Sequence, residues 1–339
     1  MPILVSQGDA AGAGWLALKQ ILSQPKKYIS PVDAGHLKNL VVVGDLFTTD
    51  EHEVQRLFEV YPFTAKIADL TEILNSKKRK KPVFLAVQSG KKFEPGQGNA
   101  VVAMRSYQAF QQALKLFRAM PDSALVTLPV SKELIMKAGI DFTGHTEQLA
   151  KTFSTSVFMC MYHPSFSVIP LTNHVALSRV PRLLYEMNTD ALKKALRQFD
   201  KIFTPKKKYA WTGLNPHAGE NGRIGNEEDF IKKNLEDFMK AGIPIDGPVS
   251  ADAAFTKNIR SQYSLFITNY HDQGLIPFKA LHGMKGVNTT LNLPQLRVSP
   301  DHGTAFHNTA INQVDVTGVL HSLKFAIKYR SSWAKAYQS

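Results

Sequence analysis

Cysteine is almost missing from this 339-residue sequence, which contains only Cys160. A single thiol cannot form an intrachain disulfide, and Cys160 stands in the apolar run 157–161, where we expect a buried, unreactive thiol. No stretch is long and apolar enough to span a bilayer, and the first residues lack the basic start of a secretory signal. These absences predict a cytoplasmic protein without a membrane segment.

Compositional bias is also missing. With 21 glycines, 18 prolines and 44% hydrophobic residues, the sequence is neither collagen-like, of low complexity nor intrinsically disordered. No G-x-G-x-x-G run follows the first predicted strand, because the segment 8–14 is only Gly-rich, so a Rossmann fingerprint is not supported. At about 150 residues per domain, the length predicts two lobes or one large α/β unit.

Acidic residues are too few to balance the basic ones, since 41 Lys and Arg face 28 Asp and Glu and leave a net charge of +13. Eight of the positive charges fall in two short runs, Lys77 to Lys81 and Lys206 to Lys208. Each run precedes an apolar segment of strand length, which indicates solvated loops that lead into strands. Nucleic-acid binding is the less favoured alternative, because aromatic residues do not interleave the runs.

Apolar segments of strand length alternate with helical patterns along the chain. The clearest helical face has apolar residues at steps of four and three, and a charged helix is expected from about Glu227 to Met239. Further helices are expected over 190–199, behind the cap candidates Asn188 and Thr189, and over 316–333. This alternation predicts an α/β fold with a mainly parallel sheet. The residues of the clearest helical face are Ala103, Tyr107, Phe110, Leu114 and Phe117, and the predicted strands are 3–6, 40–43, 82–87, 124–128, 166–171, 209–212 and 265–269.

Three of the predicted strands are each followed by a histidine. His174 follows the strand 166–171, His217 follows the strand 209–212, and His271 follows the strand 265–269. Ligands bind at the carboxyl ends of the strands in open α/β sheets, so the three imidazoles could meet there. Three imidazoles suit a borderline divalent ion such as Zn²⁺, Co²⁺ or Fe²⁺. The alternative is that each histidine caps a turn or packs in a core.

Two further segments have the composition of anion sites. Gly144-His145-Thr146-Glu147 starts a helix, whose free N–H groups favour an anion, although Thr146 or Gly144 could equally serve as a cap. The segment 279–305 places Lys279 and Arg297 among glycines and hydroxyls, which suits a phosphate or a carboxylate. It ends in Asp301-His302-Gly303-Thr304, which leads toward another helix and again offers N–H groups to a phosphate-bearing ligand.

These motifs, in this order, resemble the 4-hydroxythreonine-4-phosphate dehydrogenase family of the vitamin B6 pathway. The likeness spans nearly the whole chain. The matching segments are Phe142-Thr143-Gly144-His145-Thr146-Glu147-Gln148-Leu149-Ala150, Gly213-Leu214-Asn215-Pro216-His217-Ala218-Gly219-Glu220, Gly247-Pro248 with Ala251-Asp252 and Phe255, Tyr270-His271-Asp272-Gln273-Gly274-Leu275, Gly286-Val287-Asn288-Thr289-Thr290-Leu291, Leu293-Pro294, Arg297, and Asp301-His302-Gly303-Thr304-Ala305.

The resemblance implies an isocitrate/isopropylmalate dehydrogenase-like α/β/α fold with two lobes on a continuous, mainly parallel sheet. Residues 1–135 and 300–339 would form a cofactor-side lobe, and 136–299 a lobe that binds metal and substrate and forms the dimer. It implies a homodimer with shared active sites, so that His271 reaches the metal from the partner subunit. A phosphorylated small molecule is the expected ligand, and neither a nucleic acid nor a membrane is an expected partner.

The resemblance also implies a role for each site residue. A divalent metal (Zn, Mg or Co) would bind His174, His217 and His271. NAD, or NADP, would lie near Asp301, His302, Gly303, Thr304 and Ala305. His145 and Asp252 are the candidates for proton relay. The phosphorylated substrate would bind His145, Thr146, Lys279, Asn288 and Arg297.

The family reaction oxidises the secondary alcohol of 4-phosphooxy-threonine, and the oxo acid then loses CO₂ to give 3-amino-2-oxopropyl phosphate, a step of pyridoxine biosynthesis. A sister dehydrogenase that acts on 4-phospho-threonate or erythronate, or on a dihydrodiol dicarboxylate, is the alternative within the family. A non-catalytic basic binding protein on the same scaffold is the alternative of another class, suggested by the charge of +13.

The chain departs from the family pattern at a few positions. The opening block usually reads Gly-Asp-Pro-Ala-Gly-Ile-Gly-Pro-Glu, whereas here Gly8 to Leu16 reads Gly-Asp-Ala-Ala-Gly-Ala-Gly-Trp-Leu. Asn292 stands where glycine is usual, Pro300 interrupts the run into Asp301, and His307 stands where an acid is usual. Most of these changes flank the expected cofactor loop rather than the metal ligands.

Overall fold

The computed structural model describes residues 1–63, 66–205, 207–309 and 314–338, so Lys206 of the second basic run lies outside the described residues. The chain forms two compact units. The first unit comprises Met1–Gln148 and Pro294–Gln338, and the second comprises Leu149–Leu293. The segments 136–148 and 294–299, which the sequence prediction gives to the substrate lobe, therefore lie in the first unit.

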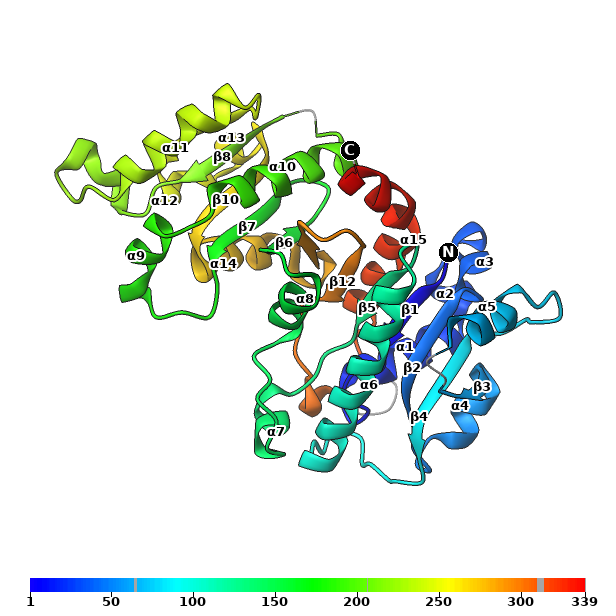
Figure 1. Cartoon of the computed structure of the whole chain (residues 1–339). Helices are drawn as coiled ribbons and strands as arrows, with labels where there is room; N and C mark the ends of the chain where they lie inside the picture. Colours follow the sequence, from blue (N-terminus) through cyan, green and yellow to red (C-terminus); the bar gives the residue numbers. More distant parts are fainter. Residues whose placement is uncertain (64–65, 206, 310–313, 339) are drawn as a thin grey trace. The chain divides into compact units, whose positions relative to one another are not determined.

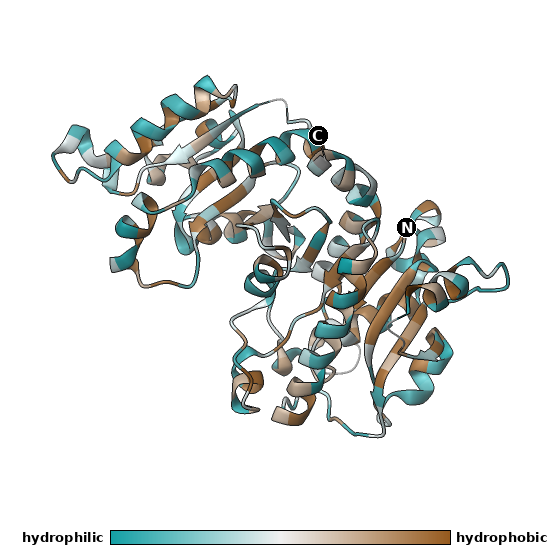
Figure 2. Ribbon diagram, viewed as in Figure 1, coloured by the Kyte–Doolittle hydropathy of each residue, from teal (hydrophilic) through white to brown (hydrophobic). Residues whose placement is uncertain are grey.

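The first unit contains six strands in the order β3-β4-β2-β1-β5-β12. All pairings among them are parallel. The central strands are almost fully buried, as expected of parallel strands that are covered on both faces, and Figure 2 shows them as the most hydrophobic part of this unit. The strands are β1 (Ile3–Ser6), β2 (Leu40–Leu46), β3 (Glu59–Pro62), β4 (Val83–Ser89), β5 (Ala124–Thr127) and β12 (Arg297–Pro300).

Helices cover this sheet, and α6 (Ala100–Ala119) packs along β1 and β2 (Figure 1). Four residues of the predicted helical face, Ala103, Phe110, Leu114 and Phe117, are buried, and the fifth, Tyr107, is half-buried, so the predicted face is confirmed. Helix α15 (Thr317–Gln338) packs on β5 and β12, in the region where the sequence predicts a C-terminal helix. The other helices are α1 (Ala13–Ser23), α2 (Pro25–Tyr28), α3 (Pro31–Leu37), α4 (Glu51–Leu57), α5 (Ile67–Asn75), α7 (Lys132–Lys137) and η4 (Phe306–Asn308).

The second unit contains six strands in the order β11-β6-β7-β10-β8-β9. Strand β6 is antiparallel to β11 and β7, whereas β10 is parallel to β7 and β8, and β8 is parallel to β9. The mainly parallel α/β fold is therefore confirmed. Cys160 in β6 is buried, as expected, and burial raises the pKa of its thiol. The strands are β6 (Phe158–Tyr162), β7 (Ser167–Thr172), β8 (Lys208–Thr212), β9 (Ile245–Val249), β10 (Tyr263–Tyr270) and β11 (Val287–Leu291).

The helices of the second unit pack on a core that includes Phe166, Phe266 and Phe278. Asn188 caps α10 (Thr189–Phe203) by accepting a hydrogen bond from the Ala191 N–H, which confirms that predicted cap. Helix α8 (His145–Phe153) begins in the first unit and ends in the second. None of the described helices is long and apolar enough to cross a membrane. The remaining helices are η1 (Leu177–Arg179), α9 (Val180–Tyr185), η2 (Pro216–Gly222), α11 (Glu228–Lys240), α12 (Ala251–Ala254), α13 (Lys257–Arg260), α14 (His271–His282) and η3 (Gly283–Lys285).

The first basic run corrects one expectation from the sequence. Four of its side chains are exposed, as a solvated loop requires, but Arg79 is buried. The Arg79 guanidinium donates hydrogen bonds to the carbonyl oxygens of Lys38, Leu74 and Lys81. A buried guanidinium with several carbonyl acceptors ties the loop to its surroundings, so Arg79 has a structural role in the run.

Candidate active site

Three adjacent parallel strands of the second unit each lead into one of the predicted metal-binding histidines. Strand β10 lies between β7 and β8, and His271 directly follows its last residue. His174 follows β7, and His217 lies in η2 after β8. Because the three strands are parallel, these histidines stand at the same edge of the sheet, as the sequence predicts.

Two of these histidines lie close together. The ring centroids of His174 and His271 are 5.8 Å apart, and both residues line a hollow of about 300 Å³. His217 instead faces Asp252, with 4.0 Å between Nδ1 and Oδ2. Within the part of the chain that the structure describes, no three His, Cys, Asp or Glu side chains are grouped as ligands of one ion. The metal site, which draws His271 from a partner subunit, stays a prediction.

A carboxylate beneath the His217 loop fixes its shape. Glu228, at the start of α11, is 2% exposed, and its Oε1 accepts hydrogen bonds from the backbone N–H groups of Leu214 (2.9 Å) and Asn215 (2.7 Å). His217 itself has a left-handed backbone, with φ of 51°. A non-glycine residue adopts this conformation only where the surroundings enforce it. Glu228 is not among the residues predicted from the sequence, because it lies in a different element from the motif that it supports.

A polar network, formed by the half-buried Gln273 with the buried Thr172, Thr212 and Asn269, joins the ends of β7, β8 and β10. The Gln273 Oε1 accepts hydrogen bonds from the Thr212 hydroxyl (2.9 Å) and from the Asn269 N–H (2.8 Å), while its Nε2 donates to the Gly213 carbonyl (2.8 Å). The Thr172 hydroxyl donates to the Asn269 carbonyl (2.8 Å). Satisfied polar groups in a buried network are mutually oriented, so this network fixes where the three histidine-bearing loops leave the sheet.

The second unit also carries three other predicted site residues. Lys279 lies exposed on α14, and Asn288 lies in β11 with a buried Oδ1 that has no hydrogen-bond partner among the described residues. Asp252 in α12 accepts a hydrogen bond from the Ser250 hydroxyl, which lowers the pKa of its carboxyl, and the nearby His217 adds to this effect. Asp252 is therefore a carboxylate at neutral pH.

The first unit holds a separate set of predicted residues around His145. The His145 imidazole lies edge-on to Phe110, with the ring centroids 4.5 Å apart, and its buried Nε2 has no hydrogen-bond partner among the described residues. Burial, together with the positive charges of Arg297 and Lys132, holds the pKa of His145 well below its usual range. Because its pKa is lowered in this way, His145 is neutral at pH 7. Thr146, also a predicted site residue, is the next residue of α8.

Arg297 is the buried cation beside His145. It is 3% exposed, and its Nη2 and Nε donate hydrogen bonds to the Thr127 hydroxyl at 2.7 and 3.2 Å. Burial lowers the pKa of Arg297 to about 10, while the nearby Glu147 carboxylate opposes that shift. Arg297 is therefore charged at neutral pH and is held in place by β5.

Lys132 also belongs to this cluster, although the sequence motifs do not point to it. At Gly144, whose φ is +152°, a Cβ would come within 2.9 Å of the Lys132 Nζ and 2.4 Å of the Glu147 Oε2. Lys132 thus lies against the start of α8, and glycine at position 144 leaves room for it. The signal in the sequence is its position, because Lys132 follows the carboxyl end of β5.

The predicted cofactor loop is a turn packed against the Gly-rich opening block. The Ala13 N–H donates a hydrogen bond to the Thr304 carbonyl (2.8 Å), and a Cβ at Gly12 would lie only 2.9 Å from the same oxygen. The His302 Nδ1–H donates a hydrogen bond to the Gly303 carbonyl (2.8 Å), and Ala305 has a left-handed backbone. The loop thus begins at Asp301, directly after β12, and its residue Thr304 contacts the first turn of α1.

The altered opening block is accommodated in the structure. Burial raises the pKa of Asp9 to about 6, while its Oδ1 accepts the Ala11 N–H (3.0 Å). Trp15, which replaces a proline of the family pattern, is fully buried, and its indole N–H donates to the Asp50 carboxylate at 2.6 Å. Leu16 replaces the acid of the family block.

The departure at Asn292 has a backbone explanation. Its φ is +60°, in the left-handed region where glycine is commonest and asparagine is the next best tolerated. Its side chain also donates a hydrogen bond to the Ser156 carbonyl at 2.6 Å. Asparagine therefore reproduces the conformation that glycine would supply and adds a contact. Pro300 ends β12.

Comparison with known proteins identifies the family of the chain. A family model described as pyridoxal phosphate biosynthetic protein PdxA matches residues 36–326. A 4-hydroxythreonine-4-phosphate dehydrogenase of Aquifex aeolicus is 41% identical, with 94% of this chain and 95% of that protein covered. The relative from Zymomonas mobilis with the same description is 34% identical, over 96% of this chain and 94% of that protein.

Solved structures show the same likeness. A 4-hydroxythreonine-4-phosphate dehydrogenase from Klebsiella pneumoniae superposes with a TM-score of 0.71 at 26% identity, covering 97% of this chain and 98% of that one. The fold and the site therefore define a two-unit α/β protein with a mainly parallel sheet and a polar edge. The chain belongs to the PdxA family.

Proposed function

We propose that this chain is a metal-dependent NAD (or NADP) oxidoreductase that oxidises the secondary alcohol of 4-phosphooxy-L-threonine, after which the product loses CO₂ to give 3-amino-2-oxopropyl phosphate in pyridoxine 5′-phosphate biosynthesis. The observation that carries the proposal is the set of three histidines after three adjacent parallel strands. The names of the relatives supply the substrate class.

The donor groups at the strand ends fit a divalent cation. His174, His217 and His271 are imidazole donors that follow three adjacent strands of one sheet. These three residues would hold the ion, with His271 contributed by the partner subunit of a homodimer. A bound divalent cation favours loss of a proton from a nearby hydroxyl and stabilises negative charge on oxygen.

The cluster around His145 would bind the anionic end of the substrate. Arg297 supplies a buried planar guanidinium and Lys132 a second positive charge, while the unpartnered Nε2 of His145 offers a further hydrogen bond. Thr146, Lys279 and Asn288 complete the proposed substrate set, and the buried Oδ1 of Asn288 is free to accept a donor of the substrate. Fixing the phosphate in this way orients the carbon that loses hydride.

Proton transfer would involve His145 and Asp252. His145 is neutral at pH 7 and can accept a proton, although its surroundings disfavour the charged form. Asp252 is ionised and lies 4.0 Å from His217. NAD, when bound near Asp301, His302, Gly303, Thr304 and Ala305, supplies the hydride acceptor, whose chemistry belongs to the cofactor.

The proposal is tested by a substrate panel combined with metal analysis. We expect NADH formation from 4-phosphooxy-L-threonine, loss of that activity on chelation, and its return when Zn²⁺, Co²⁺ or Mg²⁺ is added. Metal-replete protein that does not turn over this substrate contradicts the proposal. Preference for 4-phospho-threonate or erythronate, or for a dihydrodiol dicarboxylate, would instead assign a sister activity.

A further inference from the structure

The loop that carries His217 has an unusual backbone. Its residues 217 to 221 all have positive φ angles, between 45° and 78°, and four of the five are not glycine. Left-handed angles are unfavourable for L-amino acids and persist only where the surroundings enforce them. A run of such residues therefore requires groups elsewhere in the chain that hold it.

Glu228 holds the loop on both sides of His217. Its Oε1 accepts hydrogen bonds from the N–H groups of Leu214 (2.9 Å) and Asn215 (2.7 Å), which precede the histidine. Gly219 follows the histidine and lies so close that a Cβ there would come within 2.6 Å of the Glu228 Oε2. The carboxylate therefore lies against the backbone both before and after His217.

The Asn215 side chain adds a second carboxylate to this support. Its Nδ2 donates hydrogen bonds to the Glu227 Oε2 (2.7 Å) and to the Glu228 Oε2 (3.0 Å), and the first of these bonds lowers the pKa of Glu227. Gly225 leaves room for this contact, because a Cβ there would lie only 2.6 Å from the Asn215 Nδ2. We call Asn215, Glu227 and Glu228 the carboxylate clamp.

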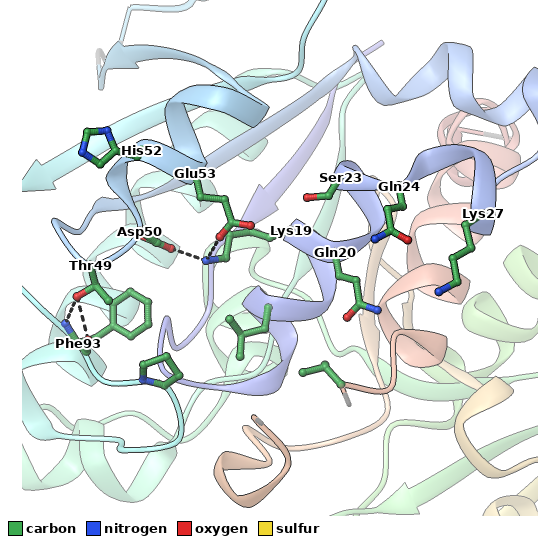
Figure 3. Close-up of a pocket in the computed structure, with 13 residues that line it drawn as sticks. Lys19, Gln20, Ser23, Gln24, Lys27, Thr49, Asp50, His52, Glu53 and Phe93 are labelled. Carbon is green, nitrogen blue, oxygen red and sulfur yellow. Dashed lines mark hydrogen bonds and ion pairs between the residues drawn. The ribbon is translucent and has the colours of Figure 1, made fainter. Parts of the chain in front are cut away.

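The charge of Glu228 is balanced in an uncommon way. In the first unit, the buried Asp50 carboxylate has a buried cation beside it, with 2.9 Å between its Oδ2 and the Lys19 Nζ (Figure 3). Glu228 is 2% exposed, and among the described residues its carboxylate accepts three N–H groups and forms no ion pair. A buried carboxylate is costly unless donors surround it. Because these donors belong to the His217 loop, the loop and the carboxylate stabilise each other.

We propose that Glu228 is a positioning residue, which keeps the His217 loop in the shape that a divalent ion needs, whether or not the ion is bound. The inference rests on the proposed function, because it takes His217 as a metal ligand. All members of the carboxylate clamp belong to the second unit of this same chain. The ion therefore binds a loop that folding has already ordered, and its affinity is higher as a result.

Metal titration of the chelated full-length protein tests this role. In Glu228→Gln either orientation of the amide turns its NH₂ group toward a donor of the loop, so the affinity for Zn²⁺ or Co²⁺ should fall by about 10- to 100-fold. Glu236→Gln is the matched control, because Glu236 is exposed on the same helix and lies outside the carboxylate clamp. Its metal affinity should stay at the wild-type value.

The loop also contains a chemical reporter of its own order. Asn221 is followed by Gly222, and both are exposed. In such a pair the glycine nitrogen attacks the side-chain amide carbon, the amide nitrogen leaves as ammonia with the glycine N–H proton, and water opens the resulting succinimide to aspartate or isoaspartate. Ring closure needs the glycine nitrogen on the same side as the asparagine side chain, whereas the ψ of 38° at Asn221 turns that nitrogen away. A loop held in this shape should consequently deamidate slowly.

Mass spectrometry of the peptide that contains Asn221 measures this reaction in the chelated protein, independently of metal and of turnover. We expect deamidation to run about tenfold faster in Glu228→Gln than in the wild type, because the loop opens more often, and at the wild-type rate in Glu236→Gln. Equal metal affinity of Glu228→Gln and the wild type, or equal deamidation rates, overturns the inference.

Asn215→Ala is a second variant that keeps the test decisive if Glu228→Gln does not fold, with thermal unfolding as the check on both. It removes the donor between the two carboxylates and should weaken metal binding by about 3- to 10-fold while raising the deamidation rate. Wild-type values of both quantities in folded Asn215→Ala also contradict the inference. Wild-type protein that binds no metal contradicts the proposed function instead, and faster deamidation of the clamp variants in that case still shows that the clamp orders the loop.

Discussion

The predicted site histidines of the two units differ in what their surroundings control: the protonation state in the first unit and the position of the loop in the second. His145 in the first unit is packed against phenylalanine rings beside two cations, so its surroundings hold it neutral. His217 in the second unit has a side chain that is 63% exposed, and its position comes from the buried groups under its loop. Burial thus sets the protonation of His145, whereas the loop that carries His217 is held at its backbone by the buried Glu228. Each arrangement leaves a different experimental signature.

The largest expected effect comes from removing an exposed histidine. His217→Ala should reduce turnover to background while thermal unfolding stays near the wild-type temperature, because the exposed side chain leaves no cavity behind. NADH formation and the metal content of the purified variant measure the effect. His36→Ala, outside the strand-end loops, is the control. Wild-type turnover in His217→Ala would contradict its assignment as a metal ligand.

A smaller effect, a loss of metal affinity, is expected when the Gln273 side chain that connects the histidine-bearing loops is replaced. Gln273→Leu deletes the amide that joins the ends of β8 and β10 and should weaken metal affinity by about 10- to 100-fold. Metal titration of the chelated protein measures it. Gln262→Leu, an exposed glutamine before β10, is the control. Unchanged metal affinity in Gln273→Leu would show that the network serves stability alone.

The buried cluster should respond through substrate affinity and through the titration of His145. Lys132→Met removes one cation beside His145, so the pKa of His145 should rise, and the KM for the phosphorylated substrate should increase by about tenfold. NMR titration of the imidazole and steady-state kinetics measure the two changes. Lys137→Met, on the exposed side of the same helix, should alter neither. An unchanged pKa of His145 in Lys132→Met would contradict an effect of the lysine charge on the imidazole.

The smallest expected effect is on the pH dependence of stability and involves His282, the last residue of α14. His282 stacks on His163 with 3.9 Å between the ring centroids, and burial, together with His163 and Arg260, lowers the pKa of His282 to about 4. As the pH falls from 6.5 to 4, the unfolded chain binds a proton at this position and the folded chain does not. The free energy of unfolding therefore falls across this window.

His282→Phe keeps an aromatic ring beside His163 and removes the titration. Its unfolding temperature should consequently fall less steeply than that of the wild type between pH 6.5 and pH 4, by a difference of about 2 °C or less. Thermal unfolding followed by circular dichroism at several pH values measures the slope. An identical slope in the two proteins would assign the pH dependence to other groups.

Local patterns predicted the elements that carry strong periodicity. The face of α6 and the strands β1, β7 and β10 follow from the spacing of apolar residues, and the Asn188 cap follows from its side chain. The antiparallel strand β6 did not follow, because its apolar run is equally typical of any buried segment. Pairing direction depends on residues far along the chain, which periodicity does not report.

The residues of the candidate site likewise fall into those that local sequence patterns predict and those that they do not. The strand-end histidines were predicted because each belongs to a loop directly after a strand. Lys132 and Glu228 were missed, since their roles depend on contacts with His145 and with the His217 loop that only folding creates. Arg79 was placed in a solvated run because composition alone does not distinguish a buried guanidinium from its exposed neighbours.

Asn292 bears on how family patterns are used to find distant members. A search that demands glycine at this position rejects a chain whose backbone has the same angle, with φ of +60°. What the position selects is tolerance of a left-handed turn, and asparagine meets that demand while anchoring itself to the Ser156 carbonyl. Patterns written in permitted backbone angles would recover such divergent members where patterns written in letters discard them.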